Sequence, residues 1–317
     1  MDSHQDDSNL DPCKLTLSPR EPFMHDSSWS PLYAAAIAEA CTNAARSVGV
    51  IHRVREESSL LAESLIAQEP DHRALLVRNS RRFQSWSLAE QLVEKSRSHC
   101  EKDEPEEGRS LAELAIEMLE QHIPADDPGK QLAFFLDLHA RAYACLGDAE
   151  GRLGRGEGAD RSFRRALSLL ESGSGDPLEK ADALRLFARF LIGTGEAGRA
   201  ARLLRQAVSL YLVTAEARQA VEATEVLATV EESRGHTIAA RQTLERTLRS
   251  EILHFRPRLS VRLLERLFRL YRRCGMSREA WALLPRIRRL ARETEDHAGW
   301  LRRLSLLLRP SEPTAVH

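Results

Sequence analysis

The chain has 317 residues, of which 42% are hydrophobic and only 5% aromatic, and its formal net charge at pH 7 is -1. Its abundance of alanine, leucine, arginine and glutamate favours helix over strand, so we expect an all-α protein. The cysteines are scattered, without a CxxC pair or a histidine at metal-ligand spacing, which argues against a disulfide framework and a zinc site.

The sequence also argues against a membrane or secreted protein. No apolar run approaches the roughly 18 to 20 residues that span a bilayer. The first residues, MDSHQDDSNLDP, are acidic and lack the apolar core of a secretory signal. We therefore expect a soluble, cytoplasmic protein with reduced thiols and no membrane contact.

Charge is distributed unevenly along the chain. Residues 1–130 contain 24 acidic and 14 basic residues, a balance of -10, whereas residues 234–309 contain 19 arginines, no lysine and 7 acidic residues, a balance of +12. Two interpretations stay open. The arginines either solvate the outer faces of helices, or they form a basic surface for an acidic protein or a nucleic acid.

The N-terminal part is expected to consist of a leader and a helical region. Residues 1–30 are polar and rich in proline, which predicts a disordered leader. A helical region then covers 31–125, because Pro31 suits a first helical position and apolar residues recur at spacings of three and four. Gly49 is expected to kink or end the first helix, and Pro70 marks a break.

A repeat governs the rest of the chain. Gly195, Gly235 and Gly275 are 40 residues apart, and each is followed by an alanine with a leucine four positions later. A fixed period of this kind is typical of stacked helix pairs that bury their faces against their neighbours. We predict about four such pairs over residues 126–296, with a period of about 40, and a degenerate pair before them at 83–122.

The first pair resembles a known repeat most closely. Its spacing of aromatic, Leu-Gly and small residues matches the tetratricopeptide signature. The residues that carry the resemblance are Tyr143, Leu146, Gly147, Ala159, Phe163 and Ala166. Over residues 75–300 the chain is similar to uncharacterised bacterial tetratricopeptide (TPR) proteins. The resemblance implies a right-handed superhelix of antiparallel helix pairs, an α-solenoid, and a scaffold for protein–protein interaction.

Three further expectations concern the C-terminal part. Tyr271 and Trp281 fit core positions, and Pro285 inside the last paired helix should kink it. Residues 297–309, HAGWLRRLSLLLR, carry their apolar residues on one side and are predicted to form a cap helix, with 310–317 as a tail.

Motifs for chemistry are lacking. The sequence contains no GxxxxGK[ST], GxSxG or HExxH pattern. The glycine-rich stretch at 151–160 has no lysine after it and falls where a turn between paired helices is expected. We therefore predict a protein that is not an enzyme, with no catalytic residue, no metal ligand and no cofactor.

The resemblance places the first helix of each pair along a concave groove, where charges alternate in sign. The candidate partner-binding residues are Arg185, Arg189, Glu222, Glu225, Arg262, Arg269 and Arg272. In one interpretation, Glu222 and Glu225 pair with Arg185, Arg189 and Arg262 on neighbouring helices, and each exposed pair contributes about 0 to 1 kcal/mol. In the other, the arginines bind carboxylates of a peptide or protein segment, since guanidinium groups bind carboxylates with two parallel hydrogen bonds.

Two alternatives use the same charges differently. The arginines of the C-terminal third would suit nucleic-acid phosphates, but we rank this partner lower because few aromatic side chains are free to stack on bases. The protein could also be regulatory, with the acidic N-terminal third docking against the basic C-terminal third. The sequence leaves the partner, the pathway and the oligomeric state open.

Overall fold

The computed structural model describes residues 31–121 and 130–294. Within these ranges the regular structure consists of α-helices and short 3-10 helices, which confirms the all-α prediction. None of the described helices is long and apolar enough to cross a membrane. The predicted leader at 1–30, the cap helix at 297–309 and the tail lie outside the described residues.

The first helix, α1, extends over Pro31–Ile66 without a break at Gly49. The expectation that Gly49 could end this helix is therefore wrong. One glycine costs a helix only about 1 kcal/mol, too little to end one of 36 residues. The chain divides into two compact units, and the division falls inside this helix, between Val54 and Arg55.

Three further α-helices precede the clear repeats. They are α2 (Pro70–Asn79), α3 (Trp86–Glu101) and α4 (Pro105–Gln121), with a 3-10 helix at Arg81–Phe83. The hydroxyl of Ser85 caps α3 by accepting a hydrogen bond from the backbone N–H of Leu88 at 3.2 Å. Helices α3 and α4 pack against each other, in the stretch where the sequence indicates a degenerate pair.

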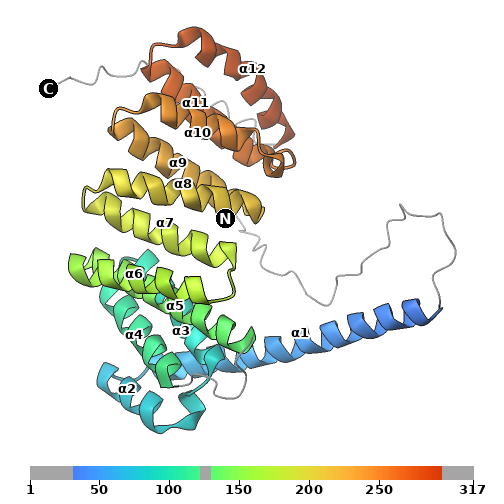
Figure 1. The fold of residues 1–317 in the computed structure, drawn as a ribbon, viewed down its shortest axis with the longest axis vertical. Coiled ribbons are helices and arrows are strands. Elements are labelled where there is room, and N and C mark those ends of the chain that lie inside the picture. Colours follow the sequence, from blue (N-terminus) through green and yellow to red (C-terminus); the bar gives the residue numbers. More distant parts are fainter. Residues whose placement is uncertain (1–30, 122–129, 295–317) are drawn as a thin grey trace, which may run out of the picture. The chain divides into compact units, whose positions relative to one another are not determined.

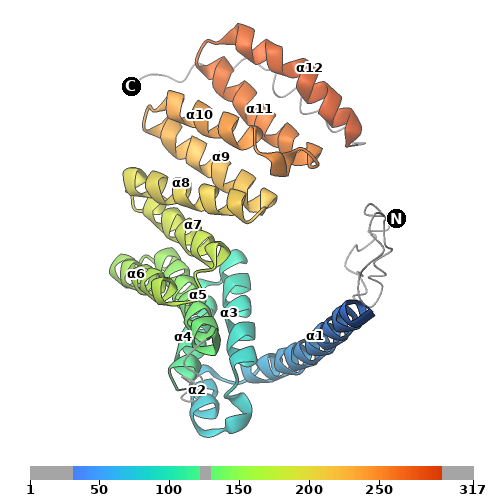
Figure 2. The same cartoon turned by 45° about the vertical axis from the view of Figure 1, so that its right-hand side comes forward.

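Four consecutive helix pairs follow, and each helix packs against the next one along the chain (Figures 1 and 2). The pairs are α5 (Lys130–Arg152) with α6 (Gly156–Ser172), α7 (Pro177–Gly193) with α8 (Ala197–Val213), α9 (Ala217–Ser233) with α10 (Thr237–Leu248), and α11 (Pro257–Arg273) with α12 (Ser277–Glu293). A 3-10 helix at Glu251–Leu253 separates the third and fourth pairs.

The repeated glycines end the first helix of each pair. Gly154, Gly195, Gly235 and Gly275 have φ values of +74°, +82°, +77° and +73°. These values lie in the left-handed region of backbone conformation, which residues with a Cβ atom avoid. At Gly195 the turn is closed by two backbone hydrogen bonds, from Gly195 N to Ile192 O at 3.2 Å and from Glu196 N to Leu191 O at 2.8 Å. The 40-residue period in the sequence therefore marks the glycine at which the first helix of each pair ends.

The core combines small residues with a few large rings. Phe163 is 1% exposed, and its ring stacks on that of Phe187 with centroids 4.9 Å apart. Gly147 makes room for Phe163, because a Cβ at Gly147 would lie 3.0 Å from the ring. Tyr271 is buried as expected, but Trp281 is 51% exposed, so its assignment to the core is wrong. It lies on α12, which no later described pair covers.

Candidate partner-binding site on the inner helices

The first helices of the pairs, α5, α7, α9 and α11, together with α3, are called the inner helices below. Charged side chains connect them in two groups. In the first group, Arg141 of α5 lies 3.8 Å from Glu94 of α3 and 3.1 Å from Glu179 of α7. Arg189 of α7 donates to Asp148 of α5. These contacts join α3, α5 and α7.

The second group joins α9 to α11. Arg262 donates to both carboxylate oxygens of Glu225, at 2.9 and 2.5 Å, and lies 4.0 Å from Glu222. Glu232 accepts hydrogen bonds from Arg266 at 2.6 Å and from Arg273. Opposite charges on neighbouring helices therefore neutralise much of this surface.

No side-chain hydrogen bond or ion pair links α7 to α9 in the part of the chain that the structure describes. The second and third pairs are connected instead through α8, where Arg205 donates to Glu231 of α9 at 2.5 Å. Glu231 is fully buried, and Arg234 and His236 lie 3.1 Å from its second oxygen. Burial alone would raise the pKa of Glu231, but the hydrogen bonds from Arg205 and His236 outweigh it, so that the pKa is lowered.

The residues predicted from the sequence have several kinds of surroundings. Glu222 and Glu225 pair with Arg262, as one interpretation expected, but not with Arg185 or Arg189. Arg185 lies 3.2 Å from the hydroxyl of Tyr211 on α8. Arg269 is exposed and donates to the backbone carbonyl of Glu265, at 3.3 Å. Arg272 is half-buried.

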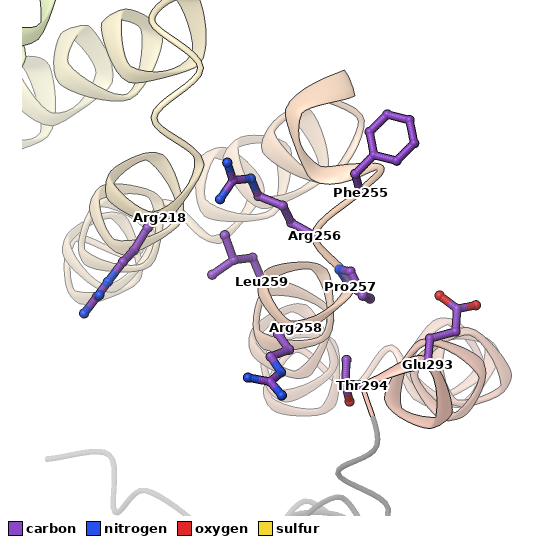
Figure 3. Close-up of a pocket in the computed structure, with 8 residues that line it drawn as sticks. All are labelled: Arg218, Phe255, Arg256, Pro257, Arg258, Leu259, Glu293 and Thr294. Atoms are coloured by element: carbon purple, nitrogen blue, oxygen red, sulfur yellow. The ribbon is translucent and has the colours of Figure 1, made fainter. Parts of the chain in front are cut away.

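A pocket of about 500 Å³ lies where α9 and α11 begin and α12 ends (Figure 3). We call it the basic pocket, and it is lined by Arg218, Phe255, Arg256, Pro257, Arg258, Leu259, Glu293 and Thr294. Arg256 and Arg258 are exposed, and no described carboxylate pairs with either of them. Phe255 is 94% exposed, and its ring points away from Arg218.

The basic pocket is continuous with the inner face formed by α9 and α11. Arg258 and Arg262 are four residues apart on α11 and therefore lie one above the other. Arg218 donates to Glu222 at 3.0 Å on α9. The residues that precede α9 and α11, Glu216 and Arg256, make no capping hydrogen bond with their side chains. The partial positive charge of two helix N-termini thus adds to that of the arginines.

A second, much smaller cavity, of about 30 Å³, lies between α3, α5 and α7. Glu179 lines it together with Arg97, Arg141 and Asp182. Burial raises the pKa of Glu179 to about 7, although Arg141 beside it favours the charged form. Neighbouring carboxylates, Asp182 among them, add to the increase.

The arginines and the phenylalanine of the basic pocket were missed by the sequence reasoning. Aligning the sequence with the repeat signature identifies positions inside helices, whereas Phe255 and Arg256 lie in the connection before α11. The signal available was the run Phe-Arg-Pro-Arg at 255–258, with a proline at the start of a helix.

The described residues offer little that would support catalysis or metal binding. No group of three or more histidine, cysteine or acidic side chains suited to a metal occurs among the described residues. Burial raises the pKa of the Cys100 thiol to about 11 and that of Cys145 to about 12, so that both favour the neutral thiol. Residues 193–198, Gly-Thr-Gly-Glu-Ala-Gly, have the glycine spacing of a dinucleotide-binding loop, but helix α7 precedes them instead of a strand.

Comparisons with known proteins concern the fold. No protein-family model matches the chain, and no curated protein matches it. BtubC from P. vanneervenii is similar in structure, with a TM-score of 0.54 and 17% identity over 83% of this chain and 96% of BtubC. A putative kinesin light chain from Podosopora anserina, with nearly identical TPR-like repeats, gives 0.49 and 18% over 64% of this chain and 94% of its own.

The Rap conjugation gene regulator of plasmid pLS20, in complex with the Phr* peptide, gives a TM-score of 0.43 and 16% identity over 71% of this chain and 60% of the regulator. Identities this low are evidence for the fold and not for a shared activity. The helix pairs, the turn glycines and the similarity to BtubC agree with one another. The chain therefore has a TPR-like fold, an α-solenoid of antiparallel helix pairs.

Proposed function

We propose that this protein is a non-catalytic scaffold, acting in the cytoplasm, that binds an acidic segment of another protein. The segment enters at the basic pocket and continues along the inner face of α9 and α11. The observation that supports this most directly is the pair of exposed arginines, Arg256 and Arg258, which lack a carboxylate partner among the described residues beside a 94% exposed Phe255.

The charge of the basic pocket suits carboxylates. It holds three arginines and one glutamate, a balance of +2. Guanidinium groups bind carboxylates through two parallel, charge-assisted hydrogen bonds. Arginine and aromatic side chains are also the residues that contribute most often to binding energy at protein interfaces. Arg256, Arg258 and Phe255 therefore form a suitable anchor for an acidic segment that also carries apolar residues.

The inner face beyond the pocket can accept further carboxylates. Arg262 is 47% exposed in its pair with Glu225, and exposed pairs contribute little to stability. A partner's carboxylate can therefore replace Glu225 on Arg262 at small cost. From Arg258 to Arg269, α11 rises about 16 Å, the length of about five extended residues.

Arg262 and Arg269 thus belong to the proposed site as the sequence predicted. Glu222 and Glu225 pair with Arg262 in the free protein, and the partner's carboxylates take their place when the segment binds. Arg185, Arg189 and Arg272 remain predictions, with the first two on α7, outside the pocket. Nucleic acid is the weaker candidate, because Phe255 is the only aromatic residue among those that line the pocket, and successive bases need several aromatic side chains to stack on.

The test compares peptide binding by three versions of the full chain. Labelled peptides of about ten residues, with increasing numbers of Asp and Glu, are titrated and followed by fluorescence anisotropy. The versions are the wild type, Arg256→Glu/Arg258→Glu, and the matched control Arg202→Glu/Arg288→Glu, which reverses two exposed arginines away from the pocket.

We expect affinity to rise with peptide acidity for the wild type and the control, and to fall about tenfold or more in the pocket variant. Equal binding by all three versions would contradict the proposal. A single-stranded oligonucleotide serves as the competing probe. If it binds more tightly than every peptide and is released steeply by salt, phosphate is the preferred ligand.

A further inference from the structure

The first part of α1, up to Val54, belongs to a unit of its own and carries an exposed apolar face. Val48 is 61% and Ile51 43% exposed, and Cys41 and Ala44 are exposed as well. These four positions follow one another at spacings of three and four residues, so they lie on one side of the helix. We call them the α1 stripe.

The same side of α1 is a packing face further along. Continuing the spacing from Ile51 leads through Arg55 to Ser58, Ala62 and Leu65. These last three side chains are 3%, 0% and 0% exposed, and the hydroxyl of Ser58 lies 2.6 Å from that of Ser87 on α3. One continuous face of a single helix is therefore covered after Arg55 and uncovered before it.

Charge is absent from the α1 stripe. Between residues 39 and 54 the formally charged side chains are Glu39, Arg46 and Arg53, seven residues apart. At 100° per residue they lie on the side of the helix opposite the stripe. A side of a helix that carries apolar residues and no charge is suited to pack against a neighbour.

The local helix propensity points the same way. Residues 48–51 are Val-Gly-Val-Ile, all poor helix formers compared with alanine or leucine. Helical stability in proteins comes mostly from packing of the apolar face. The two largest apolar residues of the stripe lie in the stretch with the lowest helix propensity. Covering them would therefore stabilise the helix where it is intrinsically least stable.

We propose that the α1 stripe is a dimer interface, covered by the α1 stripe of a second copy in antiparallel orientation. The order of side chains is self-complementary in this orientation only. Small Cys41 faces large Ile51 of the other copy, and small Ala44 faces large Val48, so that both sides fill each other's gaps. A parallel pair would place Ala44 against Ala44 and leave a void. The antiparallel contact has two-fold symmetry and closes on itself.

The first experiment measures the mass of the full chain by light scattering and sedimentation equilibrium in reducing buffer. Val48→Asp places a charge in the centre of the interface, and Val50→Asp is its matched control, since Val50 is also 50% exposed but lies away from the stripe. We expect dimers for the wild type and the control. Val48→Asp should raise the dissociation constant at least about 100-fold. A monomeric wild type, or a dimer unaffected by Val48→Asp, overturns the proposal.

The second experiment tests the orientation in a background with Cys13→Ser and Cys274→Ser. With Ile51→Cys added, mild oxidation should join Cys41 of one copy to the cysteine at position 51 of the other. Adding Cys41→Ser should abolish the covalent dimer, and Val50→Cys in place of Ile51→Cys should not form it. A Cys41–Cys41 disulfide in the background chain alone indicates a parallel pair and overturns the antiparallel arrangement. The thermal transition of each variant confirms that it is folded.

Discussion

Arg262 of α11 and Glu225 of α9 form an ion pair with two hydrogen bonds across the inner face, with nitrogen–oxygen distances of 2.9 and 2.5 Å. Despite this geometry, we expect little stabilisation, because the arginine side chain is 47% exposed. A double-mutant cycle of Arg262→Ala and Glu225→Ala should give a coupling free energy below about 1 kcal/mol. Salt should weaken it further. A coupling of several kcal/mol in urea unfolding would show that the pair is structural and not available for exchange with a partner.

Glu231 should behave very differently, because it is fully buried beside Arg205, Arg234 and His236. Glu231→Gln is expected to lower the free energy of unfolding at neutral pH by about 2 kcal/mol. The pKa of Glu231 is lowered in the folded state. Its contribution is therefore present above the unfolded pKa, near 4.3, and is lost as pH falls through the folded value. The difference between the two proteins should shrink on acidification below about pH 4. A constant difference across this range would contradict the assignment.

The turns that follow α8 and α9 offer a matched pair of substitutions, at Ala215 and Gly235. Ala215 has a φ of +59° where Gly235 has +77°, and each residue is followed by the same type of closing hydrogen bond, from Glu216 N to Tyr211 O at 2.9 Å and from His236 N to Glu231 O at 2.8 Å. A left-handed conformation costs a residue with a Cβ about 1 kcal/mol. Ala215→Gly should therefore raise the free energy of unfolding by up to about 1 kcal/mol, and Gly235→Ala should lower it by about as much. Thermal unfolding of both variants tests the opposite signs.

Glu179 should make stability fall as pH rises. Burial raises its pKa to about 7, so between about pH 4.3 and pH 7 the unfolded chain ionises this group while the folded chain keeps it protonated. The cost grows through that range and is complete above it. Glu179→Gln removes the cost, so its stability relative to the wild type should rise by about 1 to 2 kcal/mol between pH 4 and pH 8. Loss of the contact with Arg141, 3.1 Å away, offsets part of the gain. Parallel urea titrations at several pH values provide the measurement.

The fold could be predicted from the sequence because its determinants are local and repeated. The glycines at 195, 235 and 275, whose spacing indicated stacked helix pairs, end the first helix of their pairs in a left-handed conformation, and Phe163, a residue of the signature, is buried in the core. Gly49 and Trp281 were misjudged for different reasons. One glycine costs too little to end a helix as long as α1, and the exposure of Trp281 reflects the lack of a later described pair to cover α12.

The site was less accessible to sequence reasoning. A helical register shows which residues share a face, and it correctly placed Glu222, Glu225 and Arg262 near one another. It gives no information on which arginine lacks a carboxylate, since that depends on side-chain conformations across neighbouring helices. It also gives no information on the connection at 255–257, where the backbone leaves the helical pattern and Phe255 is exposed.

The absence of side-chain ion pairs between α7 and α9, among the described residues, has a consequence for how the array can change in length. Arg141 and Arg189 join only α3, α5 and α7, and Arg262 and Arg266 join only α9 and α11. An additional helix pair inserted between α8 and α9 would separate no charged partners of the inner helices. It would have to replace the contact between Arg205 and Glu231 and renew the apolar packing of α8 against α9. Duplication or loss of a repeat is therefore least costly at this junction.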